Sequence, residues 1–243
     1  MNTLGRPTLP GAIVDQIRQQ ILAGELEPGE ELPSERDLAS GFGVNRTTVR
    51  EALMELTRLG LIDRKQGRRC TVLDWRVTGS IELLVHMLRL PPGTPLRDEA
   101  AASLFDALHL AYRTSLDAIV TGQRSLAPLE ADADQLEAAI EAEDEEAVLA
   151  ADRAFHVTLF QETRSIVFQL LFLTLYRAID DGLDLGGSYG RRSAAEYVRR
   201  RSVGPRLPHR AILTALAARD LETAHAIVGR VVNVMRELYA RQH

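Results

Sequence analysis

The chain has 243 residues, of which 45% are hydrophobic and 26% are charged, and its formal net charge is −5 at pH 7. This composition is ordinary for a globular protein, and no apolar run is long enough to cross a membrane. The first residues, MNTLGRPTLPG, lack the apolar centre of a signal peptide, and the single cysteine, Cys70, excludes an intrachain disulfide. Together these features predict a cytoplasmic protein with no membrane partner.

Three helix patterns open the chain. Residues 10–23 carry isoleucines at spacings of four, which is typical of a helix with one apolar face. Ser34, with Asp37 three residues later, resembles a capping box and favours the start of a second helix. Asn45 is a good N-cap for a third helix, whose apolar residues share one face before Gly60 ends it.

Two short strands are expected next, at 61–64 and 70–73, and a basic turn joins them. Three helices and a β-hairpin wing in this order predict a winged helix-turn-helix domain over residues 1–75. Residues 76–243 show no strand pattern, and we expect an all-helical bundle domain there, so the fold class is mainly α. Helices of this second domain are expected at 79–90, 96–120, 128–142, 145–161, 166–181, 194–201, 208–218 and 221–239.

Basic residues are concentrated in a short segment of this acidic protein. Residues 46–69 hold seven basic and three acidic side chains, a local excess that is typical of DNA-binding surfaces. The first residues of a recognition helix lie nearest the base edges of the major groove, where arginine can bind guanine through two hydrogen bonds. The alternative is that these arginines are ordinary solvated helix positions, which we favour only for Arg58.

The segments LPSERDLA, VNRTTVREAL and LGLI, between residues 32 and 62, resemble the GntR family of bacterial transcription regulators. The resemblance covers residues 10–73 and implies double-stranded operator DNA as a partner. In that family, arginines of the second and third helices and the tip of the wing contact DNA, and basic residues beside the tip are expected at phosphates. The expected DNA-binding residues are Arg36, Asn45, Arg46, Thr47, Thr48, Arg50, Lys65, Gln66, Gly67 and Arg68.

The remainder, with its linker DWRVTG at 74–79, resembles the FadR-like subgroup of this family, whose C-terminal domain is of the FCD type. In many FCD proteins an aspartate and several histidines bind a metal at the floor of an effector pocket. Asp152 and His156 match this pattern on one helix face, and His209 opens a later helix, whereas Val231 stands where the last histidine is expected. The three residues are candidate ligands of zinc or another divalent ion, or a buried hydrogen-bonded cluster without metal.

Arg113 also matches a position of the family pattern. The resemblance places it in the same cavity, where a buried guanidinium suits a carboxylate or phosphate of the effector. The alternative is an ion pair with Asp117 one helical turn later. The expected effector-binding residues are Arg113, Asp152, His156 and His209.

These patterns predict a ligand-responsive regulator that binds a palindromic operator as a homodimer. The resemblance implies an acyl-CoA, a fatty acid or a small organic acid as the effector. The alternative is a metal-dependent enzyme with an appended DNA-binding domain, although no glutamate is placed as its general base. The segment GGSYG at 186–190 fits a hydrolase nucleophile motif, but no parallel sheet is predicted around it, so no catalytic residue is assigned.

Overall fold

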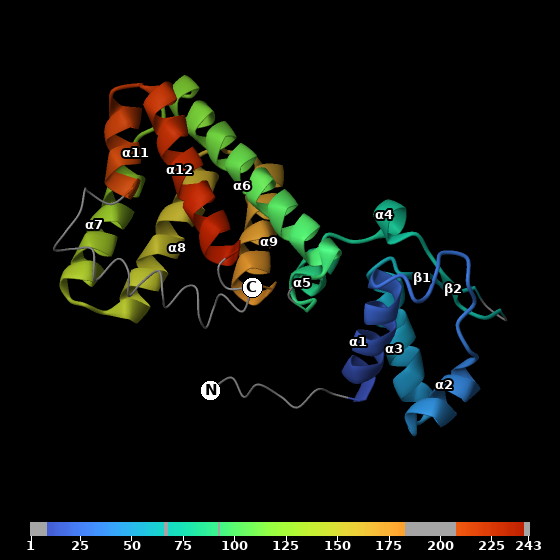
Figure 1. The fold of residues 1–243 in the computed structure, drawn as a ribbon. Coiled ribbons are helices and arrows are strands. Elements are labelled where there is room, and N and C mark those ends of the chain that lie inside the picture. Colours follow the sequence, from blue (N-terminus) through green and yellow to red (C-terminus); the bar gives the residue numbers. More distant parts are fainter. Residues whose placement is uncertain (1–8, 66–67, 92, 183–207, 241–243) are drawn as a thin grey trace. The chain divides into compact units, whose positions relative to one another are not determined.

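The computed structural model describes residues 9–65, 68–91, 93–182 and 208–240 (Figure 1). These residues are mostly helical apart from one two-stranded sheet, so the predicted fold class is confirmed. The chain forms two compact units, Met1–Leu90 and Pro91–His243, whereas we expected the boundary near residue 75. The helix expected at 194–201 and the GGSYG segment lie outside the described residues.

The first unit is a winged helix with the expected helix starts. Ser34 Oγ accepts a hydrogen bond from Asp37 N at 3.2 Å, and Asn45 Oδ1 accepts one from Thr48 N at 2.8 Å. Both caps satisfy N–H groups that have no partner inside the helix. The apolar faces of the first and third helices are buried against each other. The helices are α1 (Leu9–Leu22), α2 (Glu35–Phe42), α3 (Arg46–Arg58), α4 (Trp75–Thr78) and α5 (Leu83–Leu88).

The wing is an antiparallel pair of two-residue strands, β1 (Ile62–Asp63) and β2 (Thr71–Val72). Ile62 pairs with Val72 and both are buried, so the base of the hairpin is anchored in the core of the unit. Glu31 forms a further bridge to Thr71, which ties the segment before α2 to the sheet. The wing is therefore fixed at its base on the same core that holds α3.

The residues after the wing bond back onto the end of α3, which explains why the first unit extends beyond residue 75. Thr78 donates its hydroxyl hydrogen to Gly60 O at 2.7 Å, and Ser80 N donates to Leu59 O at 3.0 Å. These bonds occupy backbone carbonyls at the helix end, where no partner exists within the helix itself. Residues 76–90 therefore fold with the winged helix.

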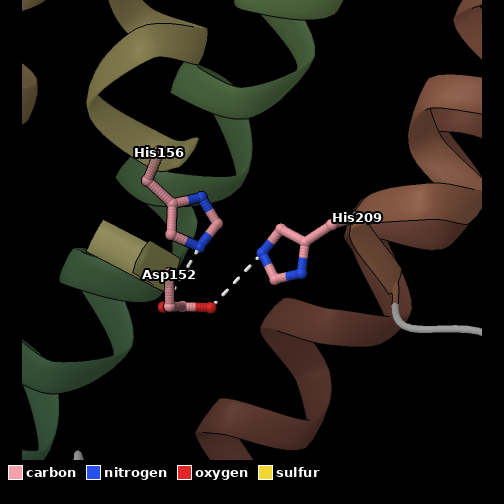
Figure 2. A group of neighbouring side chains, drawn as sticks. All are labelled: Asp152, His156 and His209. Carbon is pink, nitrogen blue, oxygen red and sulfur yellow. Dashed lines mark ion pairs between the residues drawn. The ribbon is translucent and has the colours of Figure 1, made fainter. Parts of the chain in front are cut away.

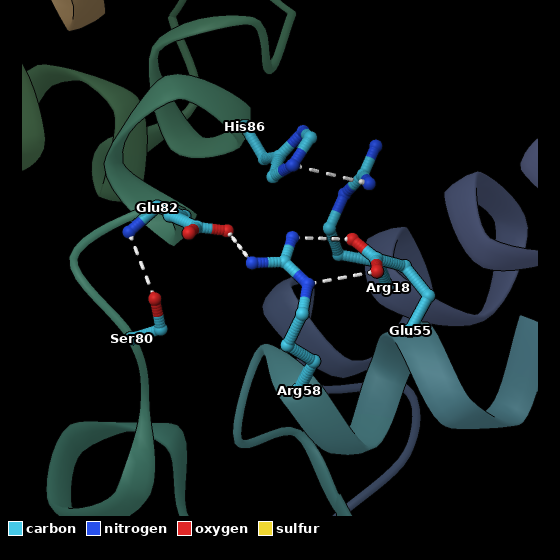
Figure 3. A network of polar contacts seen from close by, with 6 residues as sticks. All are labelled: Arg18, Glu55, Arg58, Ser80, Glu82 and His86. Atoms are coloured by element: carbon cyan, nitrogen blue, oxygen red, sulfur yellow. Dashed lines mark hydrogen bonds and ion pairs between the residues drawn. The ribbon is translucent and has the colours of Figure 1, made fainter.

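A polar network joins α1, α3 and the segment before α5 (Figure 3). Arg58 donates two hydrogen bonds, of 2.9 and 2.6 Å, to Glu55 and also pairs with Glu82. Arg18 of α1 lies 3.5 Å from His86, and burial, followed by the charge of Arg18, lowers the pKa of this histidine to about 4. Arg58, which we expected to be merely solvated, is 53% exposed but also holds the segment that follows the wing.

At Gly60 the backbone lies against the backbone of Thr78. The φ of Gly60 is +73°, and a Cβ there would lie 2.0 Å from Thr78 O. We expect Gly60→Ala to destabilise the winged-helix unit by about 2 kcal/mol or more, because a backbone clash adds to the strain of positive φ. Urea unfolding followed by the fluorescence of Trp75, the only tryptophan, measures this loss in the first unit.

Gly24→Ala is the matched control for that substitution. Gly24 has a similar φ of +76°, but nothing lies within 4 Å of the position that its Cβ would take. Its alanine variant reports the strain of positive φ alone, which costs about 1 kcal/mol. If both variants lost the same free energy of unfolding, the close approach of Thr78 O to Gly60 would contribute nothing to the loss.

The second unit is a helical bundle (Figure 1). Its helices are α6 (Pro95–Thr121), α7 (Ala127–Glu141), α8 (Glu145–Gln161), α9 (Ile166–Gly182), α11 (Pro208–Ala217) and α12 (Leu221–Ala240). The main packed pairs are α7 with α8, α6 with α12 and α11 with α12. Arg210 fastens α11 to α7 by a 2.8 Å bond from its Nε to Glu137 and by a pair with Asp134. No described helix is both long and apolar enough to span a membrane.

Candidate nucleic-acid interface and metal centre

The start of α3 forms the centre of the candidate nucleic-acid interface. Asn45, Arg46, Thr47 and Arg50 are exposed, and Thr48, whose backbone N–H donates to the Asn45 cap, is half-buried. Within the described part of the chain, Arg46 makes no ion pair. A helix N-terminus carries unpaired N–H groups and a partial positive charge, so this end of α3 attracts phosphate as well as presenting two arginines.

The other expected residues flank α3 on α2 and the wing. The Arg36 side chain is 78% exposed, with its Nε 3.6 Å from Asp37. Lys65 is 68% exposed and lies 3.1 Å from the carboxylate of Asp63, and Arg68 is exposed as well. Gln66 and Gly67 at the wing tip lie outside the described residues. The described members of the expected set thus lie at the surface of one unit.

Sequence reasoning missed an acidic residue on this surface. Glu35, the first residue of α2, accepts a hydrogen bond from Arg50 Nε and another from Arg64 Nη2, each at 2.8 Å. The bond from Arg50 is the main reason that the pKa of Glu35 lies below its ordinary value. The sequence showed only an acid in the first turn of a helix, which the helix dipole already explains.

The candidate metal centre joins α8 to α11 in the second unit (Figure 2). His209 Nε2 lies 3.3 Å from one carboxylate oxygen of Asp152, and His156 Nε2 lies 3.6 Å from the other. One donor atom from each of the three residues lies within 4.8 Å of the others. The structure therefore brings together the three residues that the sequence singled out as candidate ligands.

Aromatic rings pack against this buried cluster. Tyr112 of α6 is buried, its hydroxyl lies 3.2 Å from His156 Nδ1, and the Phe155 ring lies 4.5 Å from that of His209. Burial lowers the pKa of His156 to about 4, which leaves its ring neutral near pH 7. Burial alone would raise the pKa of Asp152, but His156 and His209 outweigh it and hold this pKa below its ordinary value.

The donor set fits a divalent ion. A carboxylate and two neutral imidazoles are ordinary zinc ligands, and bonds of about 2.1 Å place tetrahedral donors about 3.4 Å apart. The separation of 3.3 Å between His209 Nε2 and one Asp152 oxygen is close to this value, and one donor atom from each of the three residues lies within 4.8 Å of the others. The contact of Tyr112 with Nδ1 leaves Nε2 of His156 to face the cluster (Figure 2). Val231, half-buried on α12, supplies no donor.

Arg113, which we expected in the effector site, lies apart from the buried face of α6 that carries Tyr112. Its side chain is exposed, whereas the neighbouring Tyr112 is buried and contacts His156. The phase of α6 explains this difference, because Leu108, Tyr112 and Ser115 lie on the buried face and Arg113 lies outside it. Among the ion pairs of the described residues, none joins Arg113 to Asp117, and the Asp117 carboxylate lies 2.8 Å from His225 Nε2 instead.

An exposed basic helix on a winged-helix unit, followed by a helical unit with a buried polar cluster, is an arrangement typical of transcription regulators with a second, ligand-binding domain. The model of the bacterial regulatory proteins of the gntR family matches residues 9–72. The model of the FCD domain matches residues 100–234, which is more than half of the chain. The protein therefore belongs to the GntR family and carries an FCD domain.

Curated relatives agree with this assignment. Mce2R, an HTH-type transcriptional regulator of Mycobacterium tuberculosis, is 45% identical over 83 residues, which are 34% of this chain and 35% of that protein. The transcriptional repressor NanR of Citrobacter rodentium is 28% identical over 173 residues, 71% of this chain and 65% of the repressor. The putative L-lactate dehydrogenase operon regulatory protein of Escherichia coli K12 is 30% identical over 163 residues, 65% of this chain and 60% of that protein.

The matched stretches thus span about a third of the first relative and less than two thirds of the other two. Among solved structures, Lar, which controls expression of the Listeria monocytogenes agr system, covers 98% of this chain and 100% of its own. It matches with a TM-score of 0.56 at 16% identity, which shows a common fold. These relatives are named as a transcriptional regulator, a transcriptional repressor and an operon regulatory protein.

Proposed function

We propose that this regulator binds a palindromic operator in the cytoplasm as a homodimer, with one recognition helix in each half-site. The exposed start of α3, with Arg46 and Arg50 inside the segment matched by the gntR family model, carries this proposal. A two-fold symmetric dimer presents two identical helices, and its operator mirrors that symmetry. Lys65 and Arg68 add phosphate contacts, which make the affinity dependent on salt.

We further propose that the cluster of Asp152, His156 and His209 receives the effector, with a divalent ion as its cofactor. A bound ion would supply a positive charge that attracts a carboxylate. Two imidazoles and one carboxylate from the protein leave coordination positions for such a ligand, because Val231 provides no fourth donor. This donor set favours a small organic acid, and the name of the L-lactate operon relative fits that class. An acyl-CoA or fatty acid is the second candidate, supported by the resemblance of the linker at 74–79 to the FadR-like subgroup.

The effector acts on DNA binding through the populations of two arrangements of the dimer. It changes the affinity for DNA only if it binds the DNA-competent and DNA-incompetent arrangements with different strengths. A coupling of about 1–3 kcal/mol, or about 5- to 150-fold in affinity, is typical of two allosterically linked sites.

A selection experiment tests the proposal and identifies the operator sequence at the same time. The wild-type protein is used to enrich duplexes from a randomised pool, and we expect a palindromic sequence protected over two half-sites. The enriched duplex is then titrated at fixed salt with hydroxy acids such as lactate, with acyl-CoAs, and with EDTA. Release by an organic acid that Asp152→Ala abolishes supports the proposed site, whereas failure to enrich any sequence overturns the operator proposal.

A further inference from the structure

We propose that Glu35 is a positioning residue for DNA recognition: its carboxylate fixes Arg50 relative to the wing and thereby sets how well an operator is distinguished from other DNA. The inference rests on the proposed function, because it takes Arg50 as a residue that reads bases. Glu35 itself is not assigned a contact with DNA. Its action passes through the arginine that it holds.

The geometry places one carboxylate at the junction of three elements. Glu35 opens α2, Arg50 lies in the second turn of α3, and Arg64 directly follows β1. One oxygen of Glu35 accepts from Arg50 Nε and the other from Arg64 Nη2, both at 2.8 Å. The Glu35 side chain is 27% exposed, less than either the Arg50 or the Arg64 side chain, at 56% and 33%. The bridge thus ties the recognition helix and the wing to α2.

The hydrogen bond between Arg50 and Glu35 still allows the terminal amino groups of Arg50 to contact a base. The hydrogen bond uses Nε, so the two terminal amino groups keep the fork geometry that binds O6 and N7 of a guanine. A guanidinium fixed at one edge loses less side-chain entropy when it binds a base than a freely rotating one does. Arg46 forms no ion pair among the described residues, and the pair of Arg36 with Asp37 is longer, at 3.6 Å.

The charge of Glu35 also acts against DNA in general. A carboxylate near the phosphate backbone repels it, and this repulsion is the same for every sequence. A residue that only repelled DNA would weaken specific and non-specific complexes alike. A residue that also orients Arg50 helps the specific complex alone, so it raises the ratio between the two affinities.

The test compares Glu35→Ala and Glu35→Gln with wild type on two duplexes. One is the duplex enriched by the wild-type protein from a randomised pool, and the other is the same duplex with its half-sites scrambled. We expect Glu35→Ala to lower the ratio of the two affinities by about tenfold, the scale of one bidentate base contact. Glu35→Gln keeps one acceptor oxygen, so we expect it to lower this ratio by less than Glu35→Ala does. Thermal unfolding of each variant verifies that it is folded.

Glu51→Gln is the matched control. Glu51 is exposed on α3, and its substitution removes the same charge from the same unit. We expect it to strengthen binding to both duplexes and to leave their ratio unchanged. The proposal would be overturned if Glu35→Ala, like Glu51→Gln, strengthened binding to both duplexes and left the ratio of the two affinities unchanged or higher. Glu35 would then act only as a charge that repels DNA.

A double-mutant cycle separates this inference from the proposed function. In an Arg50→Ala background, Glu35→Ala is expected to leave the ratio unchanged, because its target is already absent. An equal loss with and without Arg50 contradicts positioning through that arginine. If Arg50→Ala alone does not weaken binding to the enriched duplex, the base-reading role of Arg50 fails. If it does weaken binding but Glu35→Ala keeps the ratio, only the present inference fails.

Discussion

Replacing Arg46 or Arg50 by alanine is expected to weaken binding to the enriched duplex by about 10- to 100-fold, because each arginine can supply a bidentate base contact worth about 1–3 kcal/mol. Both residues lie exposed at the start of α3, so truncation removes a reading group without opening the core. Fluorescence anisotropy with a labelled duplex at one fixed salt concentration measures the loss. The scrambled duplex shows a smaller change, since only phosphate contacts act there.

Arg230→Ala is the control for charge. Arg230 is exposed on α12 in the second unit, so its substitution changes the net charge equally but leaves the proposed interface intact. We expect its affinity for the enriched duplex to stay within about twofold of wild type, as for surface substitutions distant from a site. Unaltered affinity in both Arg46→Ala and Arg50→Ala would remove the basis for placing α3 in the groove.

Asp152→Ala is expected to reduce the affinity for Zn²⁺ by more than about 100-fold. Substitution of a residue that only hydrogen-bonds to a metal ligand costs about 10- to 100-fold, and loss of a ligand itself costs more. The aspartate lies 3.3 Å from His209 Nε2 and 3.6 Å from His156 Nε2, so its carboxylate faces both histidines. Calorimetric titration gives the affinity and the stoichiometry, and Co²⁺ absorption reports the ligand geometry. We expect one ion per chain in the wild type and a rise in melting temperature on binding.

Two further variants make the metal experiment specific. His225→Ala removes a histidine of the same unit that faces Asp117 instead of the cluster, and it is expected to keep wild-type affinity. Tyr112→Phe removes the hydroxyl that contacts His156 Nδ1. We expect it to lower the affinity for zinc by about tenfold, because the hydroxyl orients the imidazole ring of His156. A wild-type protein without a stoichiometric ion would favour the alternative of a hydrogen-bonded cluster.

The candidate metal centre was only partly predictable. Asp152 and His156 share one helix face because they are four residues apart, and that relation follows from helix geometry alone. His209 was found only by resemblance, since its approach depends on how α11 packs against α7. For α6, the apolar stripe could have indicated that Tyr112 points inward and Arg113 outward, because a step of one residue turns the side chain by about 100°.

Local interactions are what the sequence by itself determined. The caps at Ser34 and Asn45 join residues three positions apart, and the apolar stripes of α1 and α3 follow the helical repeat, so both were readable in advance. Tertiary structure alone decided the bridge from Glu35 to Arg50 and Arg64, which lie 15 and 29 residues away. It also decided the return of Thr78 onto Gly60. Such contacts depend on how packed elements meet in space, and no periodicity within one element encodes that meeting.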